Sequence, residues 1–197
     1  MAIAVEHDKR RKKILEKALT VFIEDGFEDA TFQKIADRCG ITRTILYLYF
    51  KNKREIFSYS IKQMLIDAEE KLNTIRGDRS LNSSEKIINV IMDIFRLLEE
   101  NSQLLSIVLD YLLHISKGGV NPELRVRRRT VKMRHILSSM VIEGVKAGEL
   151  KKNDIKTTSD YLYSFIETAI FQLIIYKRKD LNEYKKIVIF AVKQLMV

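Results

Sequence analysis

Four side chains with complementary binding chemistry lie within one short segment of the sequence. They combine a guanidinium group, a hydroxyl, a phenol and an alkyl group, and they are Arg43, Thr44, Tyr47 and Leu48. Arginine can form two hydrogen bonds with guanine, leucine can contact the methyl group of thymine, and a phenol can reach a phosphate. At about 100° per residue these four share one side of a helix. The opposite side is apolar, with Ile45, Leu46 and Tyr49, so the segment predicts a helix whose polar side faces a groove.

Two short helices joined by a glycine turn are predicted to position these side chains. Thr31 is a candidate N-cap for a helix that ends at Gly40, and Thr42 is a candidate N-cap for the helix that reaches Phe50. This spacing is typical of a DNA-binding helix-turn-helix, whose second helix enters the major groove. Free backbone N–H groups at both helix starts can also bind phosphate. The alternative is that the polar side chains are only the solvated surface of a small helical domain.

The flanking sequence supplies two further helices and most of the local charge. Apolar residues at helical spacing predict a helix over 9–25, with Gly26 as its stop, and a longer helix over 54–75. Cations lie at both edges of the motif, because residues 9–13 are five consecutive cations and residues 43–54 hold four cations and no acid.

Composition restricts the fold class to helices. The chain has 197 residues, of which one is proline and seven are glycine, too few for a sandwich of many short strands. Hydrophobic residues at 46% describe a chain that folds around a core. A polar connector at residues 76–84 marks a boundary between modules. Beyond it, periodicity predicts helices over 84–100, 102–116, 122–148, 154–178 and 182–196.

Charge and cysteine content indicate which kind of partner and which cellular compartment to expect. A net charge of +9 and a pI near 9.5 indicate an acidic partner, such as nucleic acid or an anionic membrane surface. The apolar faces resemble core surfaces, which disfavours a membrane partner, and the longest apolar run, residues 187–192, is too short to span a bilayer. Cys39 is the only cysteine, and the N-terminal segment does not resemble a secretory signal. We therefore expect a cytoplasmic protein without disulfides.

Catalytic patterns are missing from the sequence. The three histidines are scattered, and we find no glycine-rich phosphate loop, nucleophile elbow or metal-ligand spacing. The expectation is a protein that is not an enzyme and that has no cofactor and no metal ion.

The N-terminal 50 or so residues resemble the TetR family of bacterial transcriptional regulators. The matching segments are residues 13–22, 26–27, 31–36, 39–42, 46–53 and 56–57. The resemblance implies an all-α protein in which a long helix joins an N-terminal three-helix DNA-binding module to a C-terminal helical module for ligand binding and dimerisation. We assign residues 1–53 to the helix-turn-helix domain and residues 54–197 to the second domain.

The resemblance also assigns roles to individual residues near the motif. Thr42, Arg43 and Thr44 match the base-facing segment of the family, and Lys53 matches its phosphate-contacting lysine. Further positions match contacts to base edges or to the backbone: Thr31, Gln33, Tyr47 and Tyr49. Leu48 joins this set as a base contact, although many members have an aromatic or polar residue at its position and a small one in place of Thr44. These departures leave the operator sequence open.

The last two predicted helices are candidates for dimerisation. One carries a wide apolar stripe and the other is apolar on all sides over residues 187–192, so each needs extensive cover. We expect a four-helix bundle formed by two copies of the chain, with an intrachain core as the alternative. The predicted dimerisation residues are Leu162, Phe165, Ile166, Ala169, Ile170, Leu173, Ile187, Phe190 and Ala191.

Candidates for an effector site are scattered through the second half of the chain. Asp110 and His114, four residues apart, interrupt an apolar stretch and are either polar anchors in a pocket or a helix-surface ion pair. Apolar candidates for the lining, for which core packing is the alternative, are Phe95, Met133, Leu137 and Tyr163.

Together these features predict a transcriptional repressor that binds a palindromic operator as a homodimer, with recognition helices about 34 Å apart. Repression follows from the resemblance and not from the residues. A small-molecule effector bound in the C-terminal domain is expected to release it. A helix-turn-helix regulator without an effector is the alternative.

Overall fold

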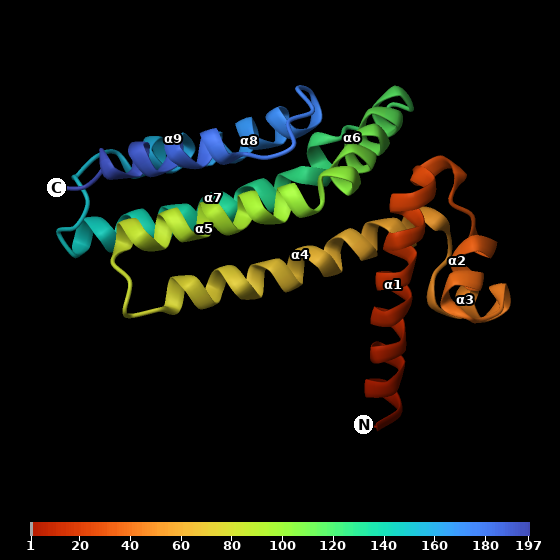
Figure 1. The fold of residues 1–197 in the computed structure, drawn as a ribbon. Helices are drawn as coiled ribbons and strands as arrows, with labels where there is room; N and C mark the ends of the chain where they lie inside the picture. The colour runs from red at the N-terminus through yellow and green to blue at the C-terminus, as the bar shows by residue number, and fades with distance from the viewer. Residues whose placement is uncertain (1) are drawn as a thin grey trace. The chain divides into compact units, whose positions relative to one another are not determined.

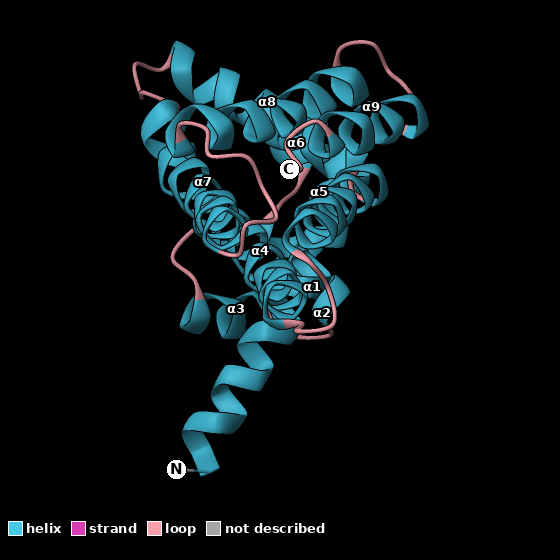
Figure 2. Cartoon of the chain, turned by 90° about the vertical axis from the view of Figure 1, so that its left-hand side faces the viewer, coloured by secondary structure: helices cyan, strands magenta, loops and turns pink. Residues whose placement is uncertain are grey.

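The structure is a computed structural model that describes residues 2–197, with the side chains of all but residues 2–5, 125 and 129. The chain divides into two compact units, Met1–Glu70 and Lys71–Val197. Helices make up most of the described chain (Figure 2), and its only β pairing is an isolated bridge between Leu150 and Met196. The predicted all-α fold is confirmed.

Four helices build the first unit or begin in it. Their bounds are α1, Ala2–Asp29; α2, Phe32–Cys39; α3, Arg43–Tyr49; and α4, Lys53–Gly77, whose last turns belong to the second unit. Within α1, Gly26 has φ +79° and ψ 172°, a conformation that interrupts the helix where the sequence predicts its stop. Glycine suits this place because side chains disfavour positive φ.

Local capping explains why α2 and α3 form where they do. The Thr31 hydroxyl oxygen accepts a hydrogen bond from the Lys34 backbone N–H, and the Thr42 hydroxyl oxygen accepts one from that of Ile45. Gly40 ends α2 in the left-handed conformation, with φ +70°. Such a threonine cap stabilises a helix by about 1 kcal/mol. All three predicted boundary residues are confirmed.

Aromatic packing forms much of the interior of the first unit. The Phe22 and Phe57 rings lie 4.8 Å apart between centroids, and Phe27 packs at 5.0 Å from Phe57. Leu46, on the apolar side of α3, is fully buried. The buried Ser60 hydroxyl donates to the Leu15 carbonyl oxygen at 2.9 Å, which ties α4 to α1.

The second unit is a bundle in which α8 and α9 pack together over α5, and α8 also packs on α7 (Figure 1). The helix bounds are α5, Ser83–Glu100; α6, Ser102–Lys117; α7, Glu123–Lys146; α8, Ile155–Ile174; and α9, Asn182–Lys193. The chain leaves α8 a few residues before the predicted end, and Lys177 beyond it has a left-handed φ of 51°.

Two carboxylates connect helices at the ends of this bundle through an ion pair and hydrogen bonds. Glu99 on α5 pairs with Lys185 of α9 at 2.8 Å, and its carboxylate also accepts the Leu181 backbone N–H. The Glu149 carboxylate accepts the Ser83 backbone N–H at the start of α5, and hydrogen bonding by the Ser83 side chain and backbone lowers the pKa of Glu149. Gly144 allows Leu150 and Ser83 to pack close to the α7 backbone, since a Cβ added at Gly144 would lie 2.5 Å from the Leu150 side chain and 2.8 Å from that of Ser83.

Candidate nucleic-acid interface

The polar side of α3 is open to solvent, as its helical periodicity predicts. Arg43 and Thr44 are exposed, and Tyr47 and Leu48 retain 48% and 76% of their accessible surface. The Arg43 guanidinium donates to the Tyr47 hydroxyl oxygen at 3.0 Å and lies over its ring. The two side chains therefore form one surface that can present N–H groups to guanine or phosphate.

Ring stacking supports both tyrosines of α3 from outside the helix. Phe32 of α2 stacks on Tyr47, with centroids 4.5 Å apart, and His7 of α1 stacks on the half-buried Tyr49 at 4.6 Å. Stacking limits the motion of each ring and thereby positions its hydroxyl. His7 could not be identified from the sequence, because no local pattern links it to a helix that begins 36 residues later.

The remaining predicted backbone contacts surround α3. Thr31, Gln33 and Thr42 are all exposed. The threonine hydroxyl oxygens accept backbone N–H groups as helix caps, which leaves their O–H groups able to donate to a phosphate. The Gln33 amide donates to the Asp37 carboxylate at 2.7 Å, so its carbonyl oxygen and second N–H remain for other contacts.

Lys53 has a structural contact of its own. Its ammonium group donates to the Glu28 carbonyl oxygen at 2.7 Å and lies 4.7 Å from the centroid of the Phe27 ring. These contacts hold the end of α1 against the start of α4. An ammonium group has three N–H donors, so a phosphate contact at the same nitrogen is stereochemically possible.

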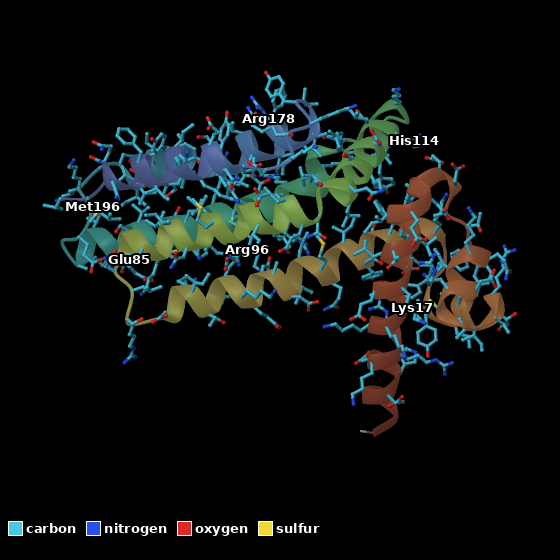
Figure 3. The ribbon with its side chains drawn as sticks, in the orientation of Figure 1. Lys17, Glu85, Arg96, His114, Arg178 and Met196 are labelled. Atoms are coloured by element: carbon cyan, nitrogen blue, oxygen red, sulfur yellow. The ribbon has the colours of Figure 1, made fainter. Side chains whose placement is uncertain are left out.

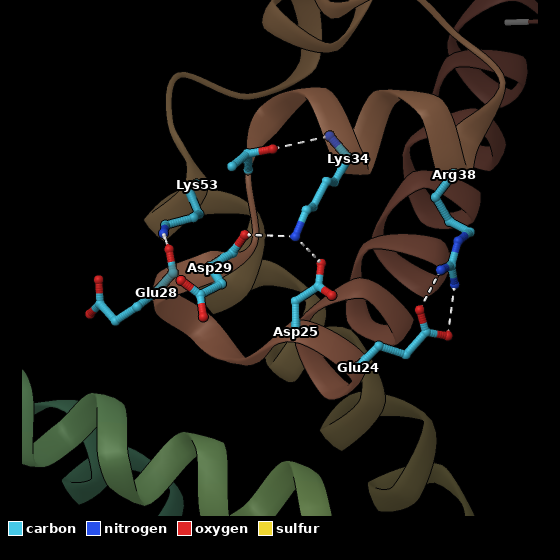
Figure 4. Close-up of polar contacts among 8 residues, drawn as sticks. Glu24, Asp25, Glu28, Asp29, Lys34, Arg38 and Lys53 are labelled. Carbon is cyan, nitrogen blue, oxygen red and sulfur yellow. Dashed lines mark hydrogen bonds and ion pairs between the residues drawn. The ribbon is translucent and has the colours of Figure 1, made fainter.

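Two cations of α2 are paired with acids from α1 (Figure 4). The Lys34 ammonium lies 3.1 Å from the Asp25 carboxylate, and the Arg38 guanidinium forms a two-pronged pair with Glu24. Hydrogen bonding by Arg38 lowers the pKa of Glu24. Both pairs are exposed, so each contributes little to stability, but both reduce the charge that α2 offers to an anion.

Metal ligands and a thiol are the reactive groups to consider in this part of the chain. Among the described residues, no group of three His, Cys, Asp or Glu side chains can hold a metal ion. Cys39 is half-buried, and burial raises the pKa of its thiol. A thiol with a raised pKa is a poor nucleophile at neutral pH.

The predicted effector residues fall into two groups. Phe95, Leu137 and Tyr163 are buried in one hydrophobic core, against which Met133 packs. Asp110 and His114 lie exposed on α6, and Figure 3 labels His114 near the end of that helix. The structure therefore brings the apolar candidates together and leaves the two polar candidates on the surface of α6.

Polar side chains around the predicted Tyr163, between α7 and α8, were not singled out from the sequence. The Arg134 guanidinium pairs with Asp160 at 2.9 Å and lies 4.8 Å from the centroid of the Tyr163 ring, while its Nε is buried without a hydrogen-bond partner. The Tyr163 hydroxyl donates to Thr130 at 3.4 Å. Arg134 belongs to a run of cations, so its sequence context offered no signal to single it out.

The residues predicted for dimerisation also fall into two groups. Five of them pack inside their own chain: Leu162, Ile166, Ala169, Leu173 and Ala191. Phe165 and Ile170 are partly buried against the same core. Ile187 and Phe190 project into solvent, with 47% and 66% of their surface accessible. The intrachain alternative thus describes the first group, because α5 and α7 cover that side of α8.

Other exposed apolar side chains of α8 and the segment after it were not predicted as interface residues. They are Tyr161, Phe171, Ile175 and Tyr176. A helical wheel places Tyr161, Phe171 and Ile175 away from Leu162, Ile166 and Leu173, so the signal was present but could not show which side was inward. Large apolar side chains at the surface indicate an interaction site when several occur together.

No helix among the described residues is long and apolar enough to cross a membrane.

Known proteins resemble the chain in two ways, through the N-terminal motif and through the whole fold. Residues 14–59 match the family of bacterial regulatory proteins described as the tetR family. A fatty acid metabolism regulator protein of Bacillus subtilis is 27% identical over 161 residues, which cover 80% of each protein.

Solved structures share the fold across nearly the full chain. A TetR transcription regulator from Haloarcula marismortui superposes with a TM-score of 0.82 at 15% identity, covering 96% of this chain and 100% of the other. The transcriptional regulator FadR from Bacillus subtilis, in complex with stearoyl-CoA, gives a TM-score of 0.70 at 23% identity, covering 91% and 96%. At these identities the likeness concerns the fold alone.

Proposed function

This chain belongs to the TetR family of bacterial transcriptional regulators, and from that premise we propose that it is a cytoplasmic repressor. In this proposal a homodimer binds a palindromic operator, and a small molecule bound within Lys71–Val197 releases it. Its residues hold and read DNA, and no catalytic step is assigned to them.

The observation that carries the proposal is the exposed polar side of α3. Arg43, Thr44 and Tyr47 face solvent together on a helix held from behind by the buried Leu46. In a helix-turn-helix, this is the arrangement that lets a second helix contact base edges. Arg43 is assigned the base-reading role, because a guanidinium group can form two hydrogen bonds with guanine.

The dimer is supported by the apolar surface of α8 and α9. We revise the predicted interface to the side chains that remain accessible: Tyr161, Phe171, Ile175, Ile187 and Phe190. Burying such side chains between two copies removes apolar area from water, at about 25 cal/mol per Å². A twofold dimer places two recognition helices on one side of the duplex, as a palindrome requires.

The effector is assigned the chemical class of long-chain acyl thioesters of coenzyme A. The relative from Bacillus subtilis is named as a fatty acid metabolism regulator, and the FadR structure holds stearoyl-CoA. In this chain, the apolar core that includes Phe95, Leu137 and Tyr163 matches an acyl chain. Arg134, with its unpartnered Nε, is a donor for a carbonyl or phosphate oxygen.

Release requires that the effector bind the two conformations of the dimer unequally. A ligand shifts an equilibrium only by its difference in affinity for the two states. The proposal therefore predicts reciprocal effects, in which the effector weakens operator binding and operator DNA weakens effector binding by the same factor.

The test begins with an operator selected from a random duplex library by the purified protein. Stearoyl-CoA is expected to raise the melting temperature and to weaken operator binding at least tenfold, whereas coenzyme A alone does neither. Met133→Trp, which adds bulk beside the core, is expected to abolish both effects. Ile142→Trp is the matched control, because Ile142 is exposed on the same helix.

Two outcomes would contradict parts of the proposal. Failure to select any preferred duplex rejects a sequence-specific regulator. Selection of an operator whose binding no acyl-CoA alters rejects this effector class and favours the regulator without a small-molecule effector.

A further inference from the structure

The first turns of α1 carry a dense positive charge that the family match does not include. The match begins at Ile14, whereas the five consecutive cations are Lys9, Arg10, Arg11, Lys12 and Lys13. We call residues 6–13 the basic segment. It is helical throughout as part of α1.

The basic segment supplies all the excess positive charge of the DNA-binding region. Residues 14–59, the matched helix-turn-helix, carry seven basic and seven acidic side chains and are therefore electrically neutral overall. Residues 6–13 carry five basic and two acidic side chains. A polyanion such as DNA is therefore attracted to this region chiefly through the segment that lies outside the match.

Several cations of the helix-turn-helix are already engaged within the protein (Figure 4). Lys34 and Arg38 pair with Asp25 and Glu24, and Lys53 donates to a backbone carbonyl oxygen. Each carboxylate in such a pair offsets the attraction of its cation for phosphate. The net charge of residues 14–59 is zero, and the cations of α2 are also neutralised locally by their ion pairs.

Ring contacts fix the basic segment beside the recognition helix. His7 stacks on Tyr49 of α3, with centroids 4.6 Å apart and planes 20° from parallel. The Arg11 guanidinium lies 5.2 Å from the centroid of the Phe50 ring and 4.3 Å from that of Tyr59. Lys12 pairs with Asp67 of α4 at 3.2 Å. These contacts hold the segment against the C-terminal end of α3, which the proposed function places at the duplex.

We propose that the basic segment is a second DNA-binding element, which contacts backbone phosphates through Lys9, Arg10 and Lys13 while α3 reads the bases. All three side chains are exposed. His7 is a positioning residue, because it acts through Tyr49. The proposal rests on the proposed DNA-binding function and adds the source of its electrostatic affinity.

The expected signature is a change in salt dependence without a change in sequence preference. Each phosphate contact releases condensed counterions. The slope of the logarithm of the binding constant against log salt concentration therefore decreases in magnitude by about 0.9 for each contact that is lost. Phosphate contacts carry no direct sequence information. Removal of the three cations should therefore weaken cognate and random duplexes by a similar factor.

The test compares the full-length protein with the triple variant Lys9→Gln, Arg10→Gln and Lys13→Gln on the selected operator and on random duplex DNA. In a dimer that loses two to six contacts, the slope is expected to fall by about 2 to 5. The matched control replaces three exposed cations of the second unit, Lys117, Lys152 and Lys156, by glutamine. It has the same net charge, and its slope is expected to stay close to that of the wild type.

The positioning role of His7 has its own test by ring rescue. His7→Ala removes the stack and is expected to lower the salt slope by about one, whereas His7→Phe keeps a ring at Tyr49 and is expected to preserve the slope. A general loss of stability would instead lower the melting temperature in both variants. If the triple variant does not fold, Arg10→Gln alone is measured, with an expected fall of about 1 to 2 in a dimer.

The outcomes separate this inference from the proposed function. If the triple variant binds a selected operator with the same slope as the charge-matched control, the basic segment is not a DNA contact, while the proposed function stands. A wild-type protein that binds no duplex overturns both.

Discussion

The two units of the chain leave different kinds of surface uncovered. On α3 the exposed side is polar and cationic, and its one large aliphatic side chain, Leu48, lies beside Arg43 and Thr44. On α8 and α9 the exposed side chains include the rings of Phe171 and Phe190. The first surface suits a hydrated polyanion, and the second suits a surface from which water is excluded.

The difference teaches that exposure alone does not identify a binding site. Leu48 and Phe190 are similarly accessible, yet their neighbours assign them to different partners. Binding through cations and phosphates weakens steeply with salt, whereas burial of apolar area is largely insensitive to it. The comparison therefore predicts that operator binding and dimerisation respond differently to the same change in ionic strength.

The largest effect is expected from a charge placed on the α8 and α9 surface. Phe190→Asp would bury a carboxylate in the proposed dimer interface, at a cost of several kcal/mol, so the dimer should dissociate at least 100-fold more readily. Sedimentation velocity at several concentrations and at 0.1 and 1 M salt measures this. Phe190→Leu is the control and should remain a dimer. A Phe190→Asp protein that stays dimeric would break the comparison.

The second effect concerns the polar surface of α3. Arg43→Ala is expected to cost about 1 to 3 kcal/mol on the selected operator and much less on random DNA, because it removes the proposed base contact. Lys51→Ala removes one exposed cation outside α3 and should weaken both duplexes equally. Fluorescence anisotropy at fixed salt distinguishes the two. Equal losses on both duplexes for Arg43→Ala would remove Arg43 from base reading.

A smaller effect tests whether the second unit is stabilised independently of DNA recognition. Glu99→Ala leaves the Lys185 ammonium and the Leu181 N–H without their acceptor, at a cost of about 1 to 3 kcal/mol in unfolding free energy. Asp93→Ala removes a more exposed pair with Arg96 on the same helix and should cost under about 1 kcal/mol. Urea unfolding measures the stability of both variants. An equal loss in unfolding free energy would contradict the stabilising role given to Glu99.

The smallest effect is a pH dependence at the start of α8. The Asp154 carboxylate accepts the Thr157 backbone N–H, and hydrogen bonding by the Thr157 side chain and backbone lowers the pKa of Asp154. A carboxylate whose pKa is lower in the folded state stabilises the fold at a pH above its unfolded-state pKa. This stabilisation is lost as the pH falls through the folded-state pKa. The stability advantage over Asp154→Asn should therefore be present at pH 7 and shrink as the pH falls below the ordinary aspartate pKa of about 3.9. An advantage that stays constant in urea titrations over this range would exclude the charged cap.

The helix-turn-helix could be predicted closely because its signals are local. Thr31, Gly40 and Thr42 act on residues within one turn of themselves, and the two sides of α3 follow from its own sequence. The DNA contacts assigned to these side chains remain predictions, although their exposure agrees with them. Lys53 shows the limit of such reasoning, because its contact with Glu28 depends on how α1 ends.

The second unit was less predictable because its helices are apolar on more than one side. Periodicity located α8, but it could not show that the side with Leu162, which we predicted as an interface, faces inward and that Phe171, which we did not predict, stays exposed. Leu162 is buried and Phe171 is exposed because α5 and α7 cover one side of α8 and leave the other accessible. The boundary assigned after residue 53 stays a prediction, whereas compact packing divides the chain after Glu70.

Composition, caps and periodicity were enough to establish the helical class, the position of α3 and the excess of cations before Ile14, since each depends on residues close together in the chain. Packing alone decided that His7 meets Tyr49, that Arg134 lies against Tyr163 and that Phe190 stays exposed. Such pairings join segments far apart in sequence, and their free energy depends on burial and distance, which no local pattern of residues contains.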